Sequence, residues 1–244
     1  MVRLRIMAMA NLRVLVVGMG GLGCPTAMAL ADAGVRRWRL MDDDVVELHN
    51  LHRQILYTEA DLGRPKVEAA SAALHARGAS DVEPLSTRFL PENAAEALRD
   101  VDLVIEGCDN VPTKFLVADA CYLHQVAVVH ASAVAWYGTA LAVGPRGGPC
   151  YRCLFEDMPL VPAPNCAEVG AMGPAVGRVA ALQVDLALRA LLGEAPWGTL
   201  YRSDGLRSTW RKTRVQARAE CTLCGEAPQI TGVARGNYVR SGGS

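Results

Sequence analysis

Four cysteines make the clearest chemical pattern in the sequence, because they fall into two Cys-x-x-Cys pairs: Cys150 with Cys153, and Cys221 with Cys224. One such pair lets two thiolates bind a metal ion, and two pairs complete the tetrahedral shell that zinc prefers. Four thiolates leave no open coordination position, so we predict a structural zinc ion. Disulfide bonds or unrelated free thiols are the alternatives.

A second pattern is the sequence GMGGLG at residues 18–23, here called the glycine loop. Its glycines are Gly18, Gly20, Gly21 and Gly23, and they fit G-x-G-x-x-G between an expected strand and an expected helix. In that setting backbone N–H groups approach a phosphate or a ribose. Asp42 follows at the end of the next expected strand, placed to accept hydrogen bonds from ribose hydroxyls. These features fit NAD as well as ATP.

Polar residues after the second expected strand favour ATP over NAD. They are Asn50, Arg53, Gln54 and Lys66, and Asp44, in the acidic triplet that ends the strand, is a further candidate for the nucleotide site. Transfer of an adenylyl group needs cations near the phosphates, because charge builds up there as pyrophosphate leaves, whereas hydride transfer does not need them. Arg53 offers a planar fork to phosphate oxygens and Lys66 a point charge at a helix start. Alone, either is an ordinary surface side chain; together, behind a nucleotide loop, they indicate ATP.

Asp109 follows a buried strand expected at residues 101–105, at the sheet edge where open α/β folds bind ligands. A carboxylate that faces a triphosphate there would hold Mg²⁺. The alternative, which is compatible with this role, is that Asp109 or Asn110 caps the following helix.

Cys166 belongs to neither cysteine pair and lies in a proline-rich loop, so it is a candidate nucleophile, with an inert thiol as the alternative. Three further cysteines have apolar neighbours and are expected in the core: Cys24, Cys108 and Cys121. The histidines show no metal-ligand spacing. Three of them are expected to be ordinary packing or surface residues: His75, His124 and His130.

Composition limits the class of protein. The 244 residues carry no net charge and are 51% hydrophobic, which argues against nucleic-acid binding and against a disordered chain. No apolar run is long enough for a transmembrane helix, and the apolar start leads into the glycine loop without a cleavage-type site, so no membrane or secretory segment is expected. A chain this rich in core residues does not need disulfides, and we expect a cytoplasmic location. Only three lysines occur: Lys66, Lys114 and Lys212.

Strands and helices are expected to alternate, as in a Rossmann-like, doubly wound, mainly parallel α/β sheet extended by antiparallel strands. Expected strands cover residues 12–17, 38–41, 101–105, 126–129, 138–143, 199–203 and 206–215. Expected helices cover residues 25–34, 66–77, 111–123 and 174–192. The dipeptide Asp204-Gly205 predicts a hairpin turn between the last two strands.

We expect one domain over residues 1–244. Residues 12–143 would form the nucleotide-binding half. Residues 144–225 would supply a crossover loop, the hairpin and the zinc ligands, and residues 230–244 a flexible tail.

The sequence resembles the ThiF/MoeB/HesA adenylyltransferases, which are related to ubiquitin-activating enzymes. The resemblance rests on motifs in family order: GMGGLG at 18–23, LMDDD at 40–44, NLHRQ at 50–54, GRPKVEAA at 63–70, CDN at 108–110, CYRC at 150–153, NCAEVGAMGP at 165–174 and CTLC at 221–224. It implies a homodimer that binds ATP and Mg²⁺ and adenylates the C-terminal Gly-Gly carboxylate of a ubiquitin-like sulfur carrier in thiamin or molybdopterin synthesis. Matched by motif, the ATP site would contain Gly21, Asp42, Asn50, Arg53, Lys66 and Asp109.

Two features depart from the family pattern. First, Arg3 and Arg5 do not reproduce the Arg-x-x-Arg-Gln-type segment that reaches the partner's ATP site. Second, the sequence has no rhodanese region, so sulfur would come from a separate donor. Cys166 matches the family's loop cysteine, whose covalent role differs among members. The alternatives are the same chemistry on another carboxylate or on a tRNA-borne base, an NAD-dependent oxidoreductase, and a catalytically silent nucleotide-binding subunit.

Overall fold

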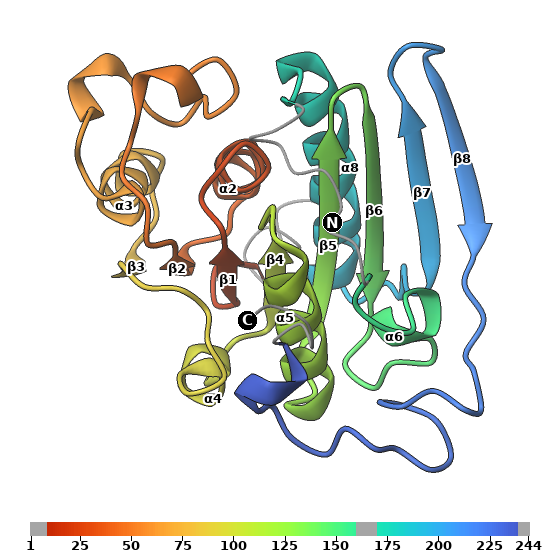
Figure 1. Ribbon diagram of the computed structural model, residues 1–244. Helices are drawn as coiled ribbons and strands as arrows, with labels where there is room; N and C mark the ends of the chain where they lie inside the picture. The colour runs from red at the N-terminus through yellow and green to blue at the C-terminus, as the bar shows by residue number, and fades with distance from the viewer. Residues whose placement is uncertain (1–8, 160–169, 239–244) are drawn as a thin grey trace, which may run out of the picture.

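A computed structural model describes residues 9–159 and 170–238. The described residues contain one eight-stranded sheet in the order β3-β2-β1-β4-β5-β6-β7-β8 (Figure 1). Strands β1 to β5 pair in parallel, and β5 to β8 pair antiparallel. The strands are β1 (Arg13–Val17), β2 (Arg37–Met41), β3 (Asp81–Leu85), β4 (Leu103–Glu106), β5 (Ala127–Val134), β6 (Tyr137–Val143), β7 (Thr199–Asp204) and β8 (Thr209–Arg214). The sequence-based prediction of a mainly parallel sheet with an antiparallel extension is confirmed.

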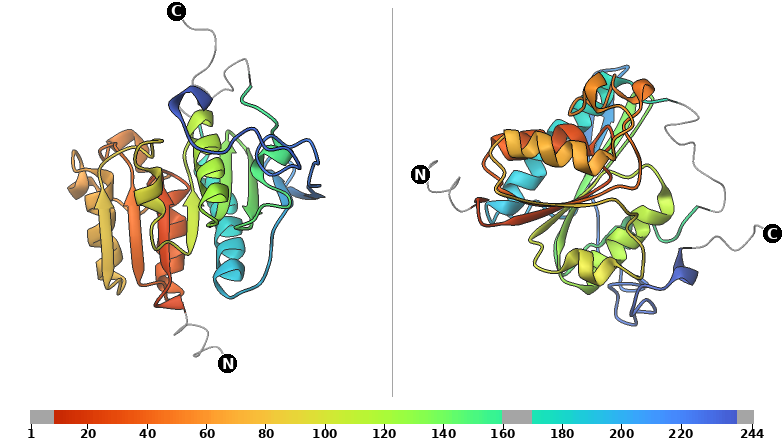
Figure 2. Two further views of the ribbon diagram at one scale, coloured as in Figure 1. Left: turned by 90° about the horizontal axis from the view of Figure 1, so that it is seen from below. Right: turned by 90° about the vertical axis from the view of Figure 1, so that its left-hand side faces the viewer.

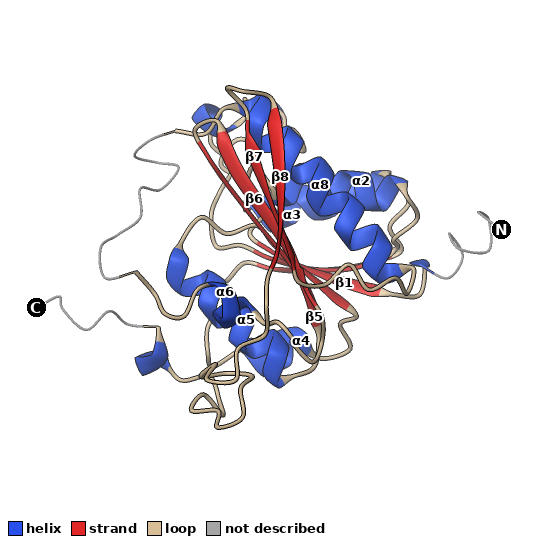
Figure 3. Cartoon of the chain, turned by 90° about the vertical axis from the view of Figure 1, so that its right-hand side faces the viewer, coloured by secondary structure: helices blue, strands red, loops and turns tan. Residues whose placement is uncertain are grey.

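Helices cover both faces of the sheet. Helices α2 (Gly23–Asp32), α3 (Lys66–Ala76) and α8 (Gly173–Leu191) lie on one face. Helices α4 (Ala94–Leu98), α5 (Val111–Leu123) and α6 (Tyr151–Leu154) lie on the other, as Figures 2 and 3 show. Short 3-10 turns occur at Leu48–Asn50, Glu59–Asp61 and Arg235–Asn237. No helix of the described part is both long and apolar enough to cross a membrane.

The core explains why the central strands are continuous apolar runs. Residues of β1 alternate between the two helical layers: Val14 and Val16 pack on the α2 side, and Leu15 and Val17 on the α5 side. Such two-sided burial is typical of parallel strands covered by helices. The carboxyl ends of β1, β2, β4 and β5 then meet at one edge, where ligands of this architecture bind.

Several elements differ from the sequence-based prediction. Strand β3 and helix α4 were not predicted, since the strand is a half-exposed edge strand that contains Pro84. The hairpin does not turn at Asp204-Gly205 alone, because Asp204 pairs with Thr209 across a four-residue turn. In the segment predicted to be a flexible tail, Tyr238 is buried and donates a hydrogen bond to Asp119 (3.0 Å).

Candidate nucleotide and zinc sites

The glycine loop connects β1 to α2 and needs glycine for steric reasons at two positions. Gly18 has a φ of +93°, a conformation that other residues rarely adopt. A side chain at Gly23 would overlap the carbonyl oxygen of Gly18. By contrast, the nearest atom to a side chain at Gly20 would be Gln54 Nε2, 3.8 Å away. The loop is therefore closed on its inner side and open at Gly20.

The open side of the loop offers backbone donors. Within the described residues, the N–H groups of Gly20 and Gly21 have no hydrogen-bond acceptor, and no side chain caps the N-terminus of α2. Unpaired N–H groups at a helix start, together with the helix dipole, favour an anion. This is the arrangement that a phosphate group needs.

Asp42 supports the loop from the end of β2. Its carboxylate accepts hydrogen bonds from Met19 N (2.7 Å) and Asp44 N (2.9 Å). Burial raises the pKa of Asp42, while Lys66 and the two N–H groups act in the opposite direction. Asp42 thus holds the loop, and each of its oxygens keeps a second lone pair for another donor, as the predicted ribose contact requires.

The two predicted cations lie around the same loop. Lys66 is the first residue of α3 and is almost fully buried, with Nζ 2.7 Å from the exposed Asp44 carboxylate. Arg53 donates a hydrogen bond to Asn50 Oδ1 (2.7 Å), and its aliphatic stem lies close to Gly21. Lys66 is therefore not the surface lysine that was the alternative for it.

Gln54 and Asn50 are also buried beside the loop. Gln54 Oε1 has no hydrogen-bond partner among the described residues, and Asn50 donates a hydrogen bond to Glu47 (3.2 Å). The structure thus brings together the predicted polar residues on one side of the glycine loop.

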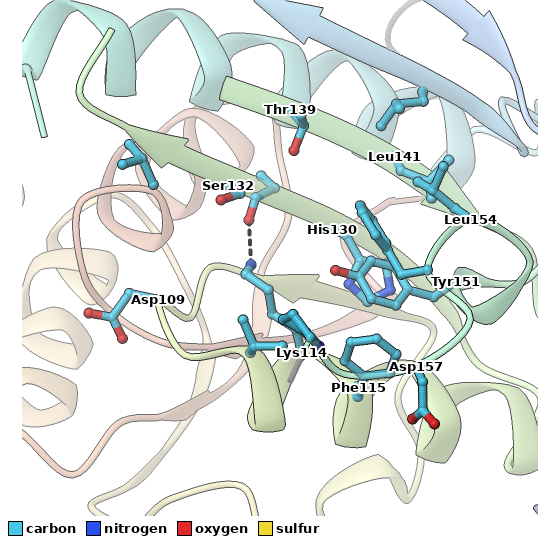
Figure 4. Close-up of a pocket in the computed structure, with 16 residues that line it drawn as sticks. Asp109, Lys114, Phe115, His130, Ser132, Thr139, Leu141, Tyr151, Leu154 and Asp157 are labelled. Carbon is cyan, nitrogen blue, oxygen red and sulfur yellow. Dashed lines mark hydrogen bonds between the residues drawn. The ribbon is translucent and has the colours of Figure 1, made fainter. Parts of the chain in front are cut away.

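Asp109 lies at one end of a cavity of about 250 Å³ between β5, β6, α5 and α6 (Figure 4). Among the described residues no group donates a hydrogen bond to its carboxylate. Asn110 caps α5, since its side chain accepts a hydrogen bond from Thr113 N (2.9 Å). The capping role therefore falls to Asn110, which leaves the Asp109 carboxylate available to a ligand.

A cluster of titratable residues that sequence reasoning did not connect lies at this cavity: Glu106, Lys114 and His130. Lys114 Nζ donates hydrogen bonds to both Glu106 oxygens (2.9 and 2.8 Å) and to Ala131 O (2.7 Å, dashed in Figure 4). His130 Nδ1 lies 3.2 Å from Glu106 Oε2. The available signals were the rarity of lysine and two polar residues, Glu106 and His130, each directly after an expected buried strand.

The four predicted zinc ligands converge. Their sulfur atoms lie within 4.8 Å of one another, with Cys150–Cys153, Cys150–Cys221 and Cys153–Cys224 separations of 3.8, 3.5 and 3.4 Å. Zinc–sulfur bonds of about 2.3 Å in a tetrahedron place the sulfurs roughly 3.8 Å apart. All four are free thiols. The cluster therefore fits a zinc ion, and the disulfide alternative is not supported.

The remaining cysteines divide into two groups. Burial raises the pKa of Cys24 to about 12 and raises the pKa values of Cys108 and Cys121 as well. These thiols stay protonated and are poor nucleophiles, as expected for core residues. Cys166 lies outside the described residues, so its role stays a prediction.

Comparisons with known proteins identify the family of this chain. A model described as the ThiF family matches residues 5–223. The chain belongs to the ThiF family. Curated relatives named adenylyltransferase and sulfurtransferase MOCS3 include one from Danio rerio, 43% identical over 92% of this chain, and one from Mus musculus, 45% identical over 91%. This ThiF-family chain spans about half the length of the curated relatives it matches.

Solved structures share the fold. Escherichia coli MccB superposes with a TM-score of 0.81 at 19% identity, over 92% of this chain and 70% of MccB. PaaA superposes with a TM-score of 0.74 at 20% identity, over 88% of this chain and 68% of PaaA. At these identities the likeness supports the fold of the ThiF-family chain and nothing more specific.

Proposed function

We propose that this chain transfers the adenylyl group of ATP to the C-terminal Gly-Gly carboxylate of a ubiquitin-like sulfur carrier, with release of pyrophosphate. The observation that carries the proposal is the position of Asp109. Its carboxylate lies at one sheet edge with the open glycine loop and also lines a cavity large enough for a peptide end. The adenylyltransferase names of the relatives at 43% and 45% identity support the reaction class.

ATP is proposed to bind with its phosphates over the glycine loop. The N–H groups of Gly20 and Gly21 and the start of α2 would face the phosphates, and Asp42 would accept hydrogen bonds from the ribose. Lys66 would turn from the exposed Asp44 to a phosphate oxygen. Arg53 lies beside Gly21, and one edge of its guanidinium group donates to Asn50. The other edge would donate to a phosphate oxygen.

Asp109 is the proposed ligand of Mg²⁺. A carboxylate without a donor among the described residues, next to a phosphate site, suits a hard cation that keeps most of its water and phosphate ligands. The acidic triplet Asp42, Asp43 and Asp44 fits Mg²⁺ less well, although its oxygens lie close together. Its carboxylates are occupied by Met19 N, Arg88 and Lys66. Bound Mg²⁺ would neutralise phosphate charge.

In the proposed reaction a carboxylate oxygen of the carrier attacks the α-phosphorus of ATP. The bond from that phosphorus to the bridging oxygen breaks, and its electron pair leaves with pyrophosphate. The nucleophile is already ionised, so no general base is needed. Arg53 and Lys66 would stabilise the extra negative charge on pyrophosphate.

The cavity beside Asp109 is the proposed site of the carrier's tail. Its walls combine β5, which contributes His130, Ala131, Ser132 and Val134, with apolar side chains such as Leu141 and Phe115. A narrow site of this kind suits an extended glycine tail. Another peptide C-terminus is the second candidate substrate, and the word sulfurtransferase in the names of the curated relatives supports an acceptor of sulfur.

We also propose a homodimer and a separate sulfur donor. Leu48, Ile55 and Leu62 are exposed large hydrophobic residues in the segment between β2 and α3, which also carries Arg53. Burial of such side chains is a common basis of subunit contact. Light scattering at micromolar concentration should give twice the mass of the chain, and charged substitutions at Leu48 and Ile55 should reduce it to that of the monomer.

Pyrophosphate exchange tests the function directly. Wild-type protein with ATP, Mg²⁺ and a carrier ending in Gly-Gly should exchange labelled pyrophosphate into ATP, and Asp109→Ala should lose the exchange. Asp185→Ala, an exposed carboxylate on α8, should retain it. Full exchange by Asp109→Ala would exclude the proposed magnesium role, and absence of exchange by the wild type with every Gly-Gly carrier would exclude the function.

A further inference from the structure

The buried cluster at the cavity leaves one polar atom unused. Glu106 Oε1 accepts hydrogen bonds from Lys114 and Cys108 N (2.7 Å), and Oε2 accepts from Lys114 and lies beside His130 Nδ1. All three protons of the Lys114 ammonium have acceptors in Glu106 and Ala131. His130 Nε2 is buried and has no hydrogen-bond partner in the part of the chain that the structure describes.

The contact with Glu106 decides which proton His130 carries. Lys114 keeps the buried Glu106 carboxylate ionised, and an ionised carboxylate accepts hydrogen bonds but donates none. Nδ1 must therefore carry a proton to interact with it. Burial lowers the pKa of His130, which keeps the ring neutral. Nε2 is then an acceptor with a free lone pair.

His130 lines the cavity from β5, and its ring stacks against that of Tyr151 with centroids 4.4 Å apart (Figure 4). Ser132 lies two residues further along the strand, toward the end of the cavity that contains Asp109. Alternate residues on a strand are separated by about 6.6 Å, which is also the repeat of an extended peptide. A tail that lies along β5 with its carboxylate near Asp109 would therefore pass His130 with its last residues.

We propose that His130 Nε2 accepts a hydrogen bond from a backbone N–H of the last two residues of the substrate tail, which makes His130 a positioning and specificity residue. The inference rests on the proposed function, because it assumes that the cavity receives that tail. It goes further in naming a donor requirement. A tail whose last residues lack an N–H, such as one that ends in proline, would leave a buried acceptor unpaired and bind poorly.

Two variants separate this contact from the structural role of His130. The side-chain nitrogen of asparagine takes the place of Nδ1 and still donates to Glu106, so His130→Asn keeps this contact while it removes the Nε2 acceptor and the ring contact with Tyr151. His124→Asn, at an exposed position after α5, is the matched control. With a synthetic nonapeptide ending in Gly-Gly, His130→Asn should raise KM for the peptide about tenfold, the scale of one buried hydrogen bond. KM for ATP and kcat should change less than twofold.

Ester analogues of the nonapeptide test the same hydrogen bond from the substrate side. An ester in place of one of the last two amides removes the N–H. For the wild-type protein, kcat/KM should be about tenfold lower with one of the two esters than with the parent nonapeptide. For His130→Asn, kcat/KM should be the same with that ester as with the parent nonapeptide. Independent, multiplying effects of the ester and the variant would overturn the proposal, because groups that form one hydrogen bond must be coupled.

A spectroscopic measurement on the wild type does not depend on turnover or on the stability of the variant. In ¹⁵N-histidine-labelled protein, His130 Nε2 should appear as an unprotonated ring nitrogen and shift to lower frequency when the nonapeptide binds. If the wild type exchanges pyrophosphate, but His130→Asn leaves KM for the peptide unchanged and the Nε2 resonance does not shift, this inference alone is overturned. A nitrogen shift without pyrophosphate exchange would support the contact and refute the proposed function, and failure of both would refute both.

Discussion

The cations around the glycine loop differ in what holds each of them when no nucleotide is bound. Lys66 has a buried stem and one carboxylate partner, Asp44, which is itself exposed. Arg53 is held by a neutral amide oxygen on Asn50. Both groups can exchange their present partner for a phosphate, because the Asp44 carboxylate is exposed and becomes hydrated when Lys66 leaves it, and because Arg53 gives up only a neutral amide. Both are also fixed close to the loop by packing.

Removal of either cation should therefore affect the chemical step more than the fold. We expect Lys66→Ala and Arg53→Ala each to lower the rate of pyrophosphate exchange by about 10²-fold, the scale of one lost charge-stabilising donor. Lys212→Ala, on exposed β8, is the control and should exchange at the wild-type rate. A loss of less than threefold in Lys66→Ala would contradict the proposed phosphate contact.

His130 should make stability depend on pH. Burial lowers the pKa of His130 below the ordinary 6.5, and the positive charge of Lys114 acts in the same direction. Glu106 and Asp119 raise the pKa but do not offset burial. Tyr151 packs on the ring. As pH falls below 6.5, the unfolded chain gains a proton that the folded chain does not, so stability falls.

We expect urea titrations to show this loss between pH 6.5 and the lower folded pKa, with a slope of up to about 1.4 kcal/mol per pH unit from this one group. His130→Asn should reduce the slope by that amount, and His124→Asn should leave it unchanged. Equal slopes for wild type and His130→Asn would show that the folded protein protonates His130 as readily as the unfolded chain.

At the scale of single residues, the sequence predicts the functional residues that stand in a recognisable motif. It does not predict contacts between buried residues that are far apart in the chain. The glycine loop, Asp109 and the cysteine pairs have spacings with a chemical meaning. The pairing of Glu106 with Lys114 and His130 joins β4, α5 and β5, and no spacing indicates it. Lys66 was predicted as a candidate cation, but its burial and its partner Asp44 required the structure.

Among the elements, the glycine loop has a shape that depends on missing side chains. A Cβ at Gly23 would overlap Gly18 O, whereas one at Gly20 would meet only the end of Gln54 at 3.8 Å. Gly23→Ala should therefore lower the free energy of unfolding by about 1–3 kcal/mol, the usual cost of overpacking, and Gly20→Ala by much less. Thermal or urea unfolding of the two variants measures this, and equal effects would contradict the loop geometry.

The elements that the sequence predicted correctly have one strong signal each. Strand β1 is a continuous apolar run, and α5 begins after a capping residue, Asn110. Strand β3 lacked such a signal, because an edge strand with proline and charged residues looks like a loop. The turn after β7 was misplaced because Asp204 both ends the strand and accepts a hydrogen bond from Arg207 N (3.1 Å).

For the molecule as a whole, one sheet connects the nucleotide-binding half to the part that carries the cysteines. We propose on this basis that residues 12–225 fold as a single domain, since β5 pairs in parallel with β4 and antiparallel with β6. The segment after β8 returns across α5, where Leu223 and Tyr238 join the core. It is held by Tyr238, which bonds Asp119, and by Cys221 and Cys224.

Zinc should therefore stabilise this returning segment and, through it, the α5 face of the sheet. Metal analysis should find about one zinc per chain in wild type and in Cys121→Ala, and none in Cys221→Ser. Loss of the ion should lower Tm by on the order of 10 °C, since each kcal/mol shifts Tm by about 2–4 °C in a chain of this size. Limited proteolysis should then cut first within residues 216–238. A zinc-free protein with wild-type Tm and an uncut segment would show that the hydrogen bond from Tyr238 to Asp119 and the packing of Leu223 suffice.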